Sequence, residues 1–412
     1  MPGMNSGSDR ADRLLAAAFR GALLQQGLIV LLIVAVVVAA WVWRDRWMVP
    51  RVRVFIGRLV AGPAVREPAV REPAGRRLLR IGFGLLWLFD GILQAQPNMA
   101  AGVPSQVIEP TAGVSPPWVQ QVVHLGQVVW TAHPLLAGSA TVWIQAGIGL
   151  WLLAAPRGTV SRLAGLVSVG WGLTVWVFGE AFGGIFAPGL TWLTGAPGAV
   201  LVYVAAGSLI ALPDRAWRSP RLGRVTMAGL GLFLAVMAGL QAQPSLGFWQ
   251  GISNGQPTPL AAMIRSMAQT PQPRFLSSLV AAFGTFTEAH GFAVNLFAVA
   301  ALALAAGAFL SGRPRVIRLG LVGFTVVCLA DWVLIEDLGF LGGLGTDPNS
   351  MIPFVLLAAG GYLALTRPVP QPADGAAAAV VCPSARPSLI ANQVVQAAST
   401  EASAARIPNA PA

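Results

Sequence analysis

The chain has 412 residues, of which 55% are hydrophobic and only 10% are charged. A soluble domain carries about 25% charged residues, so this composition excludes an ordinary soluble protein and indicates one that lies in a membrane. The net charge of +11 comes from arginines that cluster between apolar segments, which favours membrane orientation over nucleic-acid binding. The two cysteines, Cys328 and Cys382, predict neither a disulfide framework nor a metal site.

The amino-terminal part of the chain predicts a membrane anchor. Residues 1–22 are polar and are expected to be disordered, and an apolar segment follows over 23–43. This segment is too long for the apolar part of a signal peptide, and an arginine-rich stretch stops it at once. The Arg- and Pro-rich linker 44–75 is expected in the cytoplasm, which places the amino terminus outside.

Eight further apolar segments approach the ~20 residues that a helix needs to cross a bilayer. They cover about 79–96, 134–154, 160–180, 196–212, 224–242, 291–311, 317–337 and 351–366. Crossing alternately, they place the arginine clusters in the cytoplasm, with Arg265 and Arg274 as exceptions. The sequence therefore predicts an all-α, polytopic integral membrane protein with about nine transmembrane helices. We expect it in a bacterial cytoplasmic (inner) membrane, with a disordered cytoplasmic tail over 367–412.

A five-residue motif, Leu-Gln-Ala-Gln-Pro, occurs at 93–97 and again at 240–244. A shift of 147 residues superposes the two motifs, and a shift of 156 superposes later segments. These matches predict two four-helix membrane repeats, over 76–213 and 223–366. Because each repeat has an even number of spans, the two enter the membrane in the same orientation and are parallel. The motif itself is interpreted as the end of the first span of each repeat.

The first outer loop contains a segment with a helical period, Pro117–Thr131, in which Gln120 and His124 fall on one face. The matching stretch of the second repeat, Phe275–Thr287, is more apolar. Helices of this kind generally lie at the headgroup boundary of a membrane. They could also cover a site that opens outward.

Ionisable residues inside membrane spans are costly and mark candidate functional positions. Glu180 and Glu336 are the leading pair, because a shift of 156 superposes them together with the tryptophan four residues before each. Such a carboxyl group could exchange protons, bind a cation or bond a quinone, or it could bond across the bundle and lock the fold. The other candidates for a polar site at the outer membrane face are His133, His290, Gln94, Gln96, Gln241, Gln243, Asp90, Asp331 and Asp337.

The first repeat opens with Arg80-Ile-Gly-Phe-Gly-Leu-Leu-Trp-Leu-Phe-Asp-Gly. Its second span contains Gln145-Ala-Gly-Ile-Gly-Leu-Trp-Leu-Leu, followed by Arg157 and Arg162. In these features, over about 76–366, the chain resembles the DoxX/DoxD-like four-helix bacterial membrane proteins, in tandem duplicate. The resemblance implies an association with membrane oxidoreductase assemblies, but it carries over no catalytic motif.

Three functions stay open at this point. The first is an accessory or quinone-linked subunit of an envelope redox complex, with a quinone as cofactor and membrane redox proteins as partners. The second is a transporter or channel for a small or cationic solute. The third is a membrane scaffold that binds a partner through its outer loops, 98–132 and 245–290. The sequence assigns no catalytic residue, cofactor-binding motif or metal ligand, and it predicts contact with the lipid bilayer but not with nucleic acid.

Overall fold

A computed structural model of the chain describes residues 5–47, 72–341 and 344–367. Most of the predicted linker and nearly all of the predicted tail lie outside these residues. Apart from one hairpin, Ile252–Ser253 (β1) with Gln256–Pro257 (β2), the regular elements of the described residues are helices. The predicted all-α class is therefore confirmed for the part of the chain that the structure describes.

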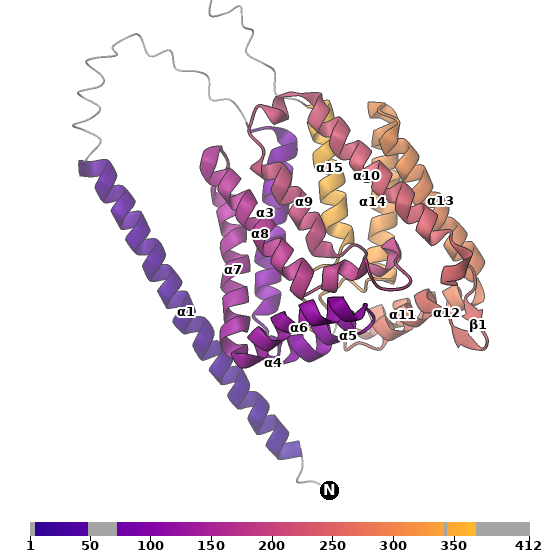
Figure 1. Cartoon of the computed structure of the whole chain (residues 1–412), viewed down its shortest axis with the longest axis horizontal. Coiled ribbons are helices and arrows are strands. Elements are labelled where there is room, and N and C mark those ends of the chain that lie inside the picture. Colours follow the sequence, from indigo (N-terminus) through magenta and orange to yellow (C-terminus); the bar gives the residue numbers. More distant parts are fainter. Residues whose placement is uncertain (1–4, 48–71, 342–343, 368–412) are drawn as a thin grey trace, which may run out of the picture. The chain divides into compact units, whose positions relative to one another are not determined.

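The longer helices after α1, with α9 and α15, run side by side between two ends of a bundle (Figure 1). They are α3 (Ala74–Gln94), α7 (Pro134–Ala154), α8 (Gly158–Phe178), α9 (Ala199–Ala211), α10 (Pro220–Gln241), α13 (Gly291–Leu310), α14 (Pro314–Leu334) and α15 (Met351–Thr366). Close packing between some of them depends on glycine. At Gly149 on α7, for example, an added Cβ would lie 2.7 Å from the Gly84 carbonyl oxygen of α3, so a larger residue would push these helices apart.

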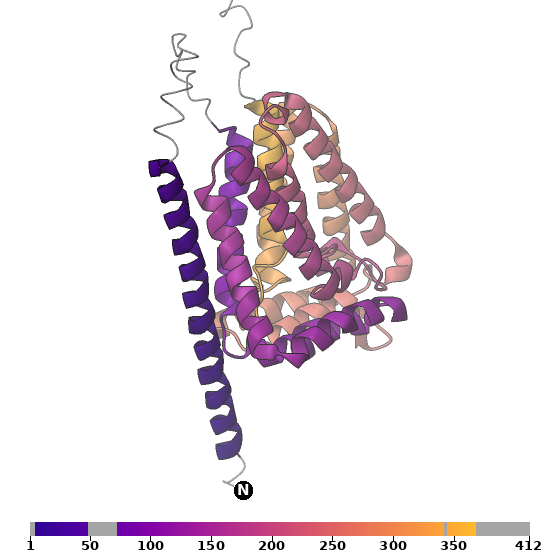
Figure 2. The ribbon, with the colours of Figure 1, turned by 60° about the vertical axis from the view of Figure 1, so that its left-hand side comes forward.

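Shorter helices lie across one end of the bundle, which we call the α6 end (Figures 1 and 2). They are α4 (Met99–Gly102), the π-helix η1 (Val103–Ile108), α5 (Glu109–Gly113), α6 (Pro117–Ala132), α11 (Pro259–Ala268) and α12 (Arg274–Ala289). Short 3-10 helices complete the loops: η2 (Ala181–Gly184), η3 (Trp192–Thr194), η4 (Ala216–Arg218) and η5 (Pro244–Leu246). The helices predicted in the two long loops are thus confirmed as α6 and α12.

Six of the described helices are long and apolar enough to cross a membrane. They are the segment 13–40 and the helices α7, α8, α10, α13 and α14. A seventh span results if α3 and the segment Met99–Gly113, bent by 90° against each other, form one. The helices α9 and α15 are apolar but shorter, with 13 and 16 residues. The chain is therefore a multi-pass membrane protein, and the number of nine spans stays a prediction.

The outward faces of the spanning helices carry large apolar side chains. Leu304 on α13 and Leu319 on α14 are each 75% exposed, and Leu150 on α7 and Leu166 on α8 are exposed as well. Soluble monomers rarely leave apolar patches of this extent in contact with water. The exposed leucines therefore fit helices that face lipid.

Helix α1 (Asn5–Trp47) begins well before the predicted anchor, so residues 5–22, which were expected to be disordered, are helical. This part of the chain is rich in Ala, Leu and Arg, which favour helices. Two contacts join it to the bundle near the α6 end. The Trp143 indole N–H donates to the Leu23 carbonyl at 3.1 Å, and Phe19 is fully buried.

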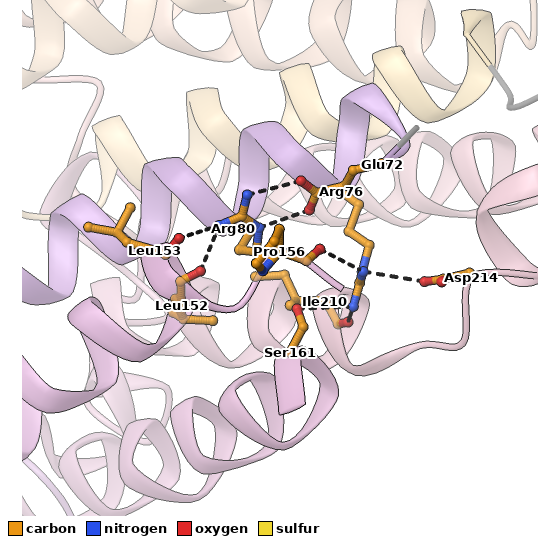
Figure 3. A network of polar contacts seen from close by, with 9 residues as sticks. All are labelled: Glu72, Arg76, Arg80, Leu152, Leu153, Pro156, Ser161, Ile210 and Asp214. Atoms are coloured by element: carbon orange, nitrogen blue, oxygen red, sulfur yellow. Dashed lines mark hydrogen bonds and ion pairs between the residues drawn. The ribbon is translucent and has the colours of Figure 1, made fainter. Parts of the chain in front are cut away.

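Two buried arginines on α3 join the helices at the opposite end of the bundle, which we call the arginine end (Figure 3). Arg76 is fully buried and donates to the Ile210 carbonyl at 3.1 Å and to Ser161 Oγ at 3.2 Å. It also forms an ion pair with the half-exposed Asp214 at 3.3 Å. The Ile210 carbonyl belongs to the last turn of α9, where the helix leaves carbonyl groups unpaired and a cation is favoured.

Arg80 plays a similar part at the end of α7. Its guanidinium group donates to both oxygens of Glu72, at 2.8 and 2.9 Å, and to the carbonyls of Leu152 at 2.7 Å and Leu153 at 3.0 Å. Arg80 and Glu72 are both largely buried, so water screens their attraction little. Figure 3 shows how the two arginines thereby tie α3 to the ends of α7 and α9.

Candidate functional site

A pocket of about 530 Å³ lies at the α6 end, between α3, α6, α7 and α8. We call it the first pocket. Its aromatic lining consists of Trp87, Trp130, Trp171 and Phe178. Its polar lining consists of Asp90, Gln94, Thr141, Gln145, Thr174, Glu180, Thr346 and Asp347. Pockets of this size, with apolar walls and a few converging polar groups, are typical of small-molecule sites.

Several buried polar atoms of this lining have no hydrogen-bond partner among the residues that the structure describes. They are Asp90 Oδ1, Gln94 Oε1, Gln145 Oε1, Glu180 Oε2 and Trp171 Nε1. An unpaired polar atom in a protein interior costs about 1–3 kcal/mol. Because all of these residues line one pocket and most of the atoms are oxygens, the pocket matches a ligand that donates several hydrogen bonds.

Glu180 reaches the first pocket because α8 ends two residues earlier, at Phe178. Its Oε1 atom accepts a hydrogen bond at 3.2 Å from the backbone N–H of Val200, in the first turn of α9. A carboxyl group is favoured at this end of a helix. One oxygen of Glu180 therefore holds the start of α9, while the other stays available to the pocket.

Glu336 holds the start of α15 in the same manner, but with both oxygens engaged. Its Oε1 accepts from the Ser350 hydroxyl at 2.6 Å and its Oε2 from the Met351 backbone N–H at 3.4 Å. Glu336 is buried and lines neither the first pocket nor the pocket that contains Asp331. Its contacts are those of a side chain that locks the fold.

The glutamines of the repeated motif differ in the same way. Gln94 leaves its Oε1 atom unpaired at the first pocket. At the corresponding place in the second half, Gln241 is fully buried and bonded on both sides. Its Nε2 donates to Asn295 Oδ1 at 2.6 Å, and its Oε1 accepts from the Thr191 hydroxyl. In the second half, other side chains of the protein thus pair the glutamine of the motif. In the first half, the corresponding glutamine oxygen faces the pocket unpaired.

The structure does not bring all predicted site residues together. Asp90, Gln94 and Glu180 line the first pocket, whereas Asp331 lines a separate one. Of the remaining candidates, Glu336, Gln241 and Asp337 are buried, Gln96 is partly buried, and His133, His290 and Gln243 are exposed. Both histidines directly precede a helix, α7 or α13, and neither lines the first pocket or the pocket that contains Asp331.

Part of the first pocket comes from the far half of the chain. Thr346 and Asp347, in the loop between α14 and α15, line it together with residues of α3 and α7. Conversely, Trp192 and Leu193, in the loop between α8 and α9, line the separate pocket of the second half. The sequence prediction missed these residues because no pattern in it indicates which half a loop completes.

Acidic groups dominate the electrostatics of the first pocket. Its described lining includes the carboxyl groups of Asp90, Glu180 and Asp347 and no Arg, Lys or His. Burial, followed by the negative charge of Asp347, raises the pKa of Glu180 to about 8. Burial also raises the pKa of Asp347, although hydrogen bonds from Thr346 and the Asn349 N–H oppose the shift. Glu180 therefore holds a proton at neutral pH, which a bound cation would displace.

These features define a multi-pass membrane protein with an acid-rich, aromatic-walled pocket at one end of its helices. No protein-family model, curated protein or solved structure matches the chain.

Proposed function

We propose that the protein binds a small organic cation with several N–H donors in the first pocket, as a transporter for such solutes would. The unpaired oxygens of Asp90, Gln94, Gln145 and Glu180, which all face one pocket, are the observation that carries this proposal. The tryptophans of the lining add to it, because aromatic faces attract cations. A cation with several donors would pair the oxygens and neutralise the carboxylates at the same time.

The redox alternative fits this lining less well. The carbonyl oxygens of a quinone could accept a hydrogen bond from protonated Glu180, but they would leave the side-chain oxygens of Gln94 and Gln145 unpaired. A quinol offers two hydroxyl donors and fits better than the quinone does. A quinol is therefore the informative competitor for the proposed cation.

The proposal includes nine spans and two parallel four-helix repeats over the predicted ranges. A hydrogen bond of the same kind in both halves supports the repeats. The Trp176 indole N–H donates to the Pro197 carbonyl, and the Trp332 indole N–H donates to the Pro348 carbonyl, each at 2.8 Å. A run of left-handed residues then follows the glutamate of each half. These residues are Ala181, Phe182 and Gly183 in the first half and Asp337, Leu338 and Gly339 in the second.

The distribution of arginine supports the proposed orientation. From α3 onwards, the segments that join helices at the α6 end contain only Arg265 and Arg274. At the arginine end, the joining segments and the first two turns of the helices beside them contain most of the others. Arginine-rich loops stay in the cytoplasm. The first pocket would then lie towards the outer face of a bacterial cytoplasmic membrane.

Calorimetric titration of the protein in nanodiscs tests the proposed ligand. We expect spermidine or agmatine to bind, and tetramethylammonium, which has no N–H donor, to bind more weakly. Asp90→Asn should weaken the binding by at least about tenfold, because a hydrogen bond to a charged group contributes about 1.5–3 kcal/mol. Asp331→Asn, in the separate pocket, is the matched control and should bind as the wild type does.

Two results would contradict the proposal. One is the absence of saturable binding by any of these cations to folded wild-type protein. The other is an equal loss of affinity in Asp90→Asn and Asp331→Asn. Binding of a short-chain ubiquinol in place of the cations, with the same sensitivity to Asp90→Asn, would favour the redox alternative instead.

A further inference from the structure

A second pocket, of about 320 Å³, lies between α12, α13 and α14 and is closed on one side by η3. Its lining is apolar except for one residue, Asp331 on α14. The apolar residues include Trp192, Phe286, Ala293, Phe297 and Val327. The second pocket therefore combines a hydrocarbon-like wall with a single carboxyl group.

Asp331 is only 4% exposed, and neither of its carboxyl oxygens has a hydrogen-bond partner among the described residues. The nearby acidic side chain, Glu336, is engaged by Ser350 and Met351 and offers Asp331 no donor. A buried carboxyl group without partners opposes folding. The shift of 156 residues places Val175 at the corresponding position of the first half, so an apolar residue would satisfy the packing there.

The second pocket adjoins the apolar outer surface of the bundle. Phe286 and Phe297, which line it, are 48% and 65% exposed. Both belong to helices at the side of the second half, α12 and α13, and α13 is long and apolar enough to span a membrane. A ligand with a hydrocarbon body can therefore reach Asp331 from the lipid without first crossing a polar surface.

The composition of the wall decides what the ligand must be. A single carboxylate offers two acceptor oxygens and one negative charge, which together match one ammonium group. The aromatic rings beside it add attraction for a cation, and the remaining surface matches hydrocarbon. The first pocket, with several unpaired oxygens, calls for a ligand with more donors.

We propose that the second pocket is a binding site for a lipophilic primary amine. Its ammonium group meets Asp331, and its hydrocarbon body packs against Phe297 and Val327. This site is separate from the cation site of the first pocket, and neither proposal depends on the other.

Titration of n-octylamine into the full-length protein in phosphatidylcholine nanodiscs, with empty nanodiscs as reference, tests the second site. We expect saturable binding to the wild type. Asp331→Asn should weaken it by at least tenfold, and 1-octanol, which has the same body and no charge, should bind the wild type at least tenfold more weakly than octylamine. Asp90→Asn should leave octylamine binding unchanged, which separates this site from the first pocket.

A second variant tests the position of the amine without changing Asp331. Ala293 is exposed and lines the pocket, so Ala293→Phe can fill the space from the outside with little effect on the fold. Folded Ala293→Phe should lose octylamine binding and keep spermidine binding. Absence of saturable octylamine binding to the wild type would overturn the proposal, and so would binding that survives both Asp331→Asn and Ala293→Phe.

Discussion

Arg76→Met is expected to lower the free energy of unfolding by about 1–3 kcal/mol, the cost of leaving a buried hydrogen-bond acceptor without its donor. The methionine would leave the Ile210 carbonyl, Ser161 and Asp214 without the donor that now joins them. These groups belong to different segments of the chain, so the end of α9 would lose its tie to α3. The midpoint of thermal unfolding in detergent, together with elution as a single species, measures this effect.

The neighbouring residue supplies the matched control. Arg77 is exposed, and its replacement by Met should change the unfolding free energy by no more than about 0.5 kcal/mol. If Arg76→Met and Arg77→Met unfold at the same temperature, the buried contacts of Arg76 do not stabilise the bundle. The second half of the chain has no arginine at the corresponding position. There Gly223 takes its position, and the backbone of Leu365 lies so close that an added Cβ would overlap it.

The stability of the ligand-free protein is expected to fall as the pH rises from about 5 to about 8. Burial raises the pKa of Glu180 from 4.5 to about 8, so the folded protein holds a proton that the unfolded chain releases over this range. One such proton lowers the free energy of unfolding by up to about 1.4 kcal/mol per pH unit. Burial also raises the pKa of Glu336, to about 7, which adds to the slope in the same direction.

Glu180→Gln isolates the contribution of the first pocket to this pH dependence. In this variant the free energy of unfolding should depend less steeply on pH, by the contribution of up to one proton. Glu109→Gln, which changes an exposed carboxyl group, should leave this dependence unaltered. The affinity of the wild type for spermidine should rise over the same pH range, because the cation must displace the proton of Glu180. Thermal unfolding at stepped pH, with and without spermidine, measures both trends. An unchanged slope in Glu180→Gln would show that this carboxyl group does not hold the proton.

Apolar runs and helical periods were sufficient to predict the six helices that are long and apolar enough to cross a membrane, and the helices α6 and α12, because lipid and the headgroup boundary impose simple patterns on a sequence. The beginning of α1 was missed because Arg13 and Arg20 are helix formers as well as polar residues. The pairing of Glu180 with Glu336 was visible from the internal matches, but their difference was not. That difference depends on hydrogen-bond donors from other segments of the chain, such as the Ser350 hydroxyl that donates to Glu336.

The same reason limits what the sequence could say about the candidate site. Gln94 and Gln241 stand in identical five-residue motifs, and only their surroundings separate an unpaired oxygen from a bonded one. Asn295 and Thr191, which bond Gln241, come from distant segments. Contacts of this kind follow from the packing of the bundle, and no local sequence pattern predicts them.

The crossing of the two loops couples the two pockets of the bundle. Thr346 and Asp347 serve a pocket whose other walls belong to the first half, and Trp192 and Leu193 serve one whose other walls belong to the second. Each pocket therefore takes its shape and chemistry from both halves of the chain. A substitution in either loop would therefore alter a pocket whose other walls belong to the opposite half of the chain.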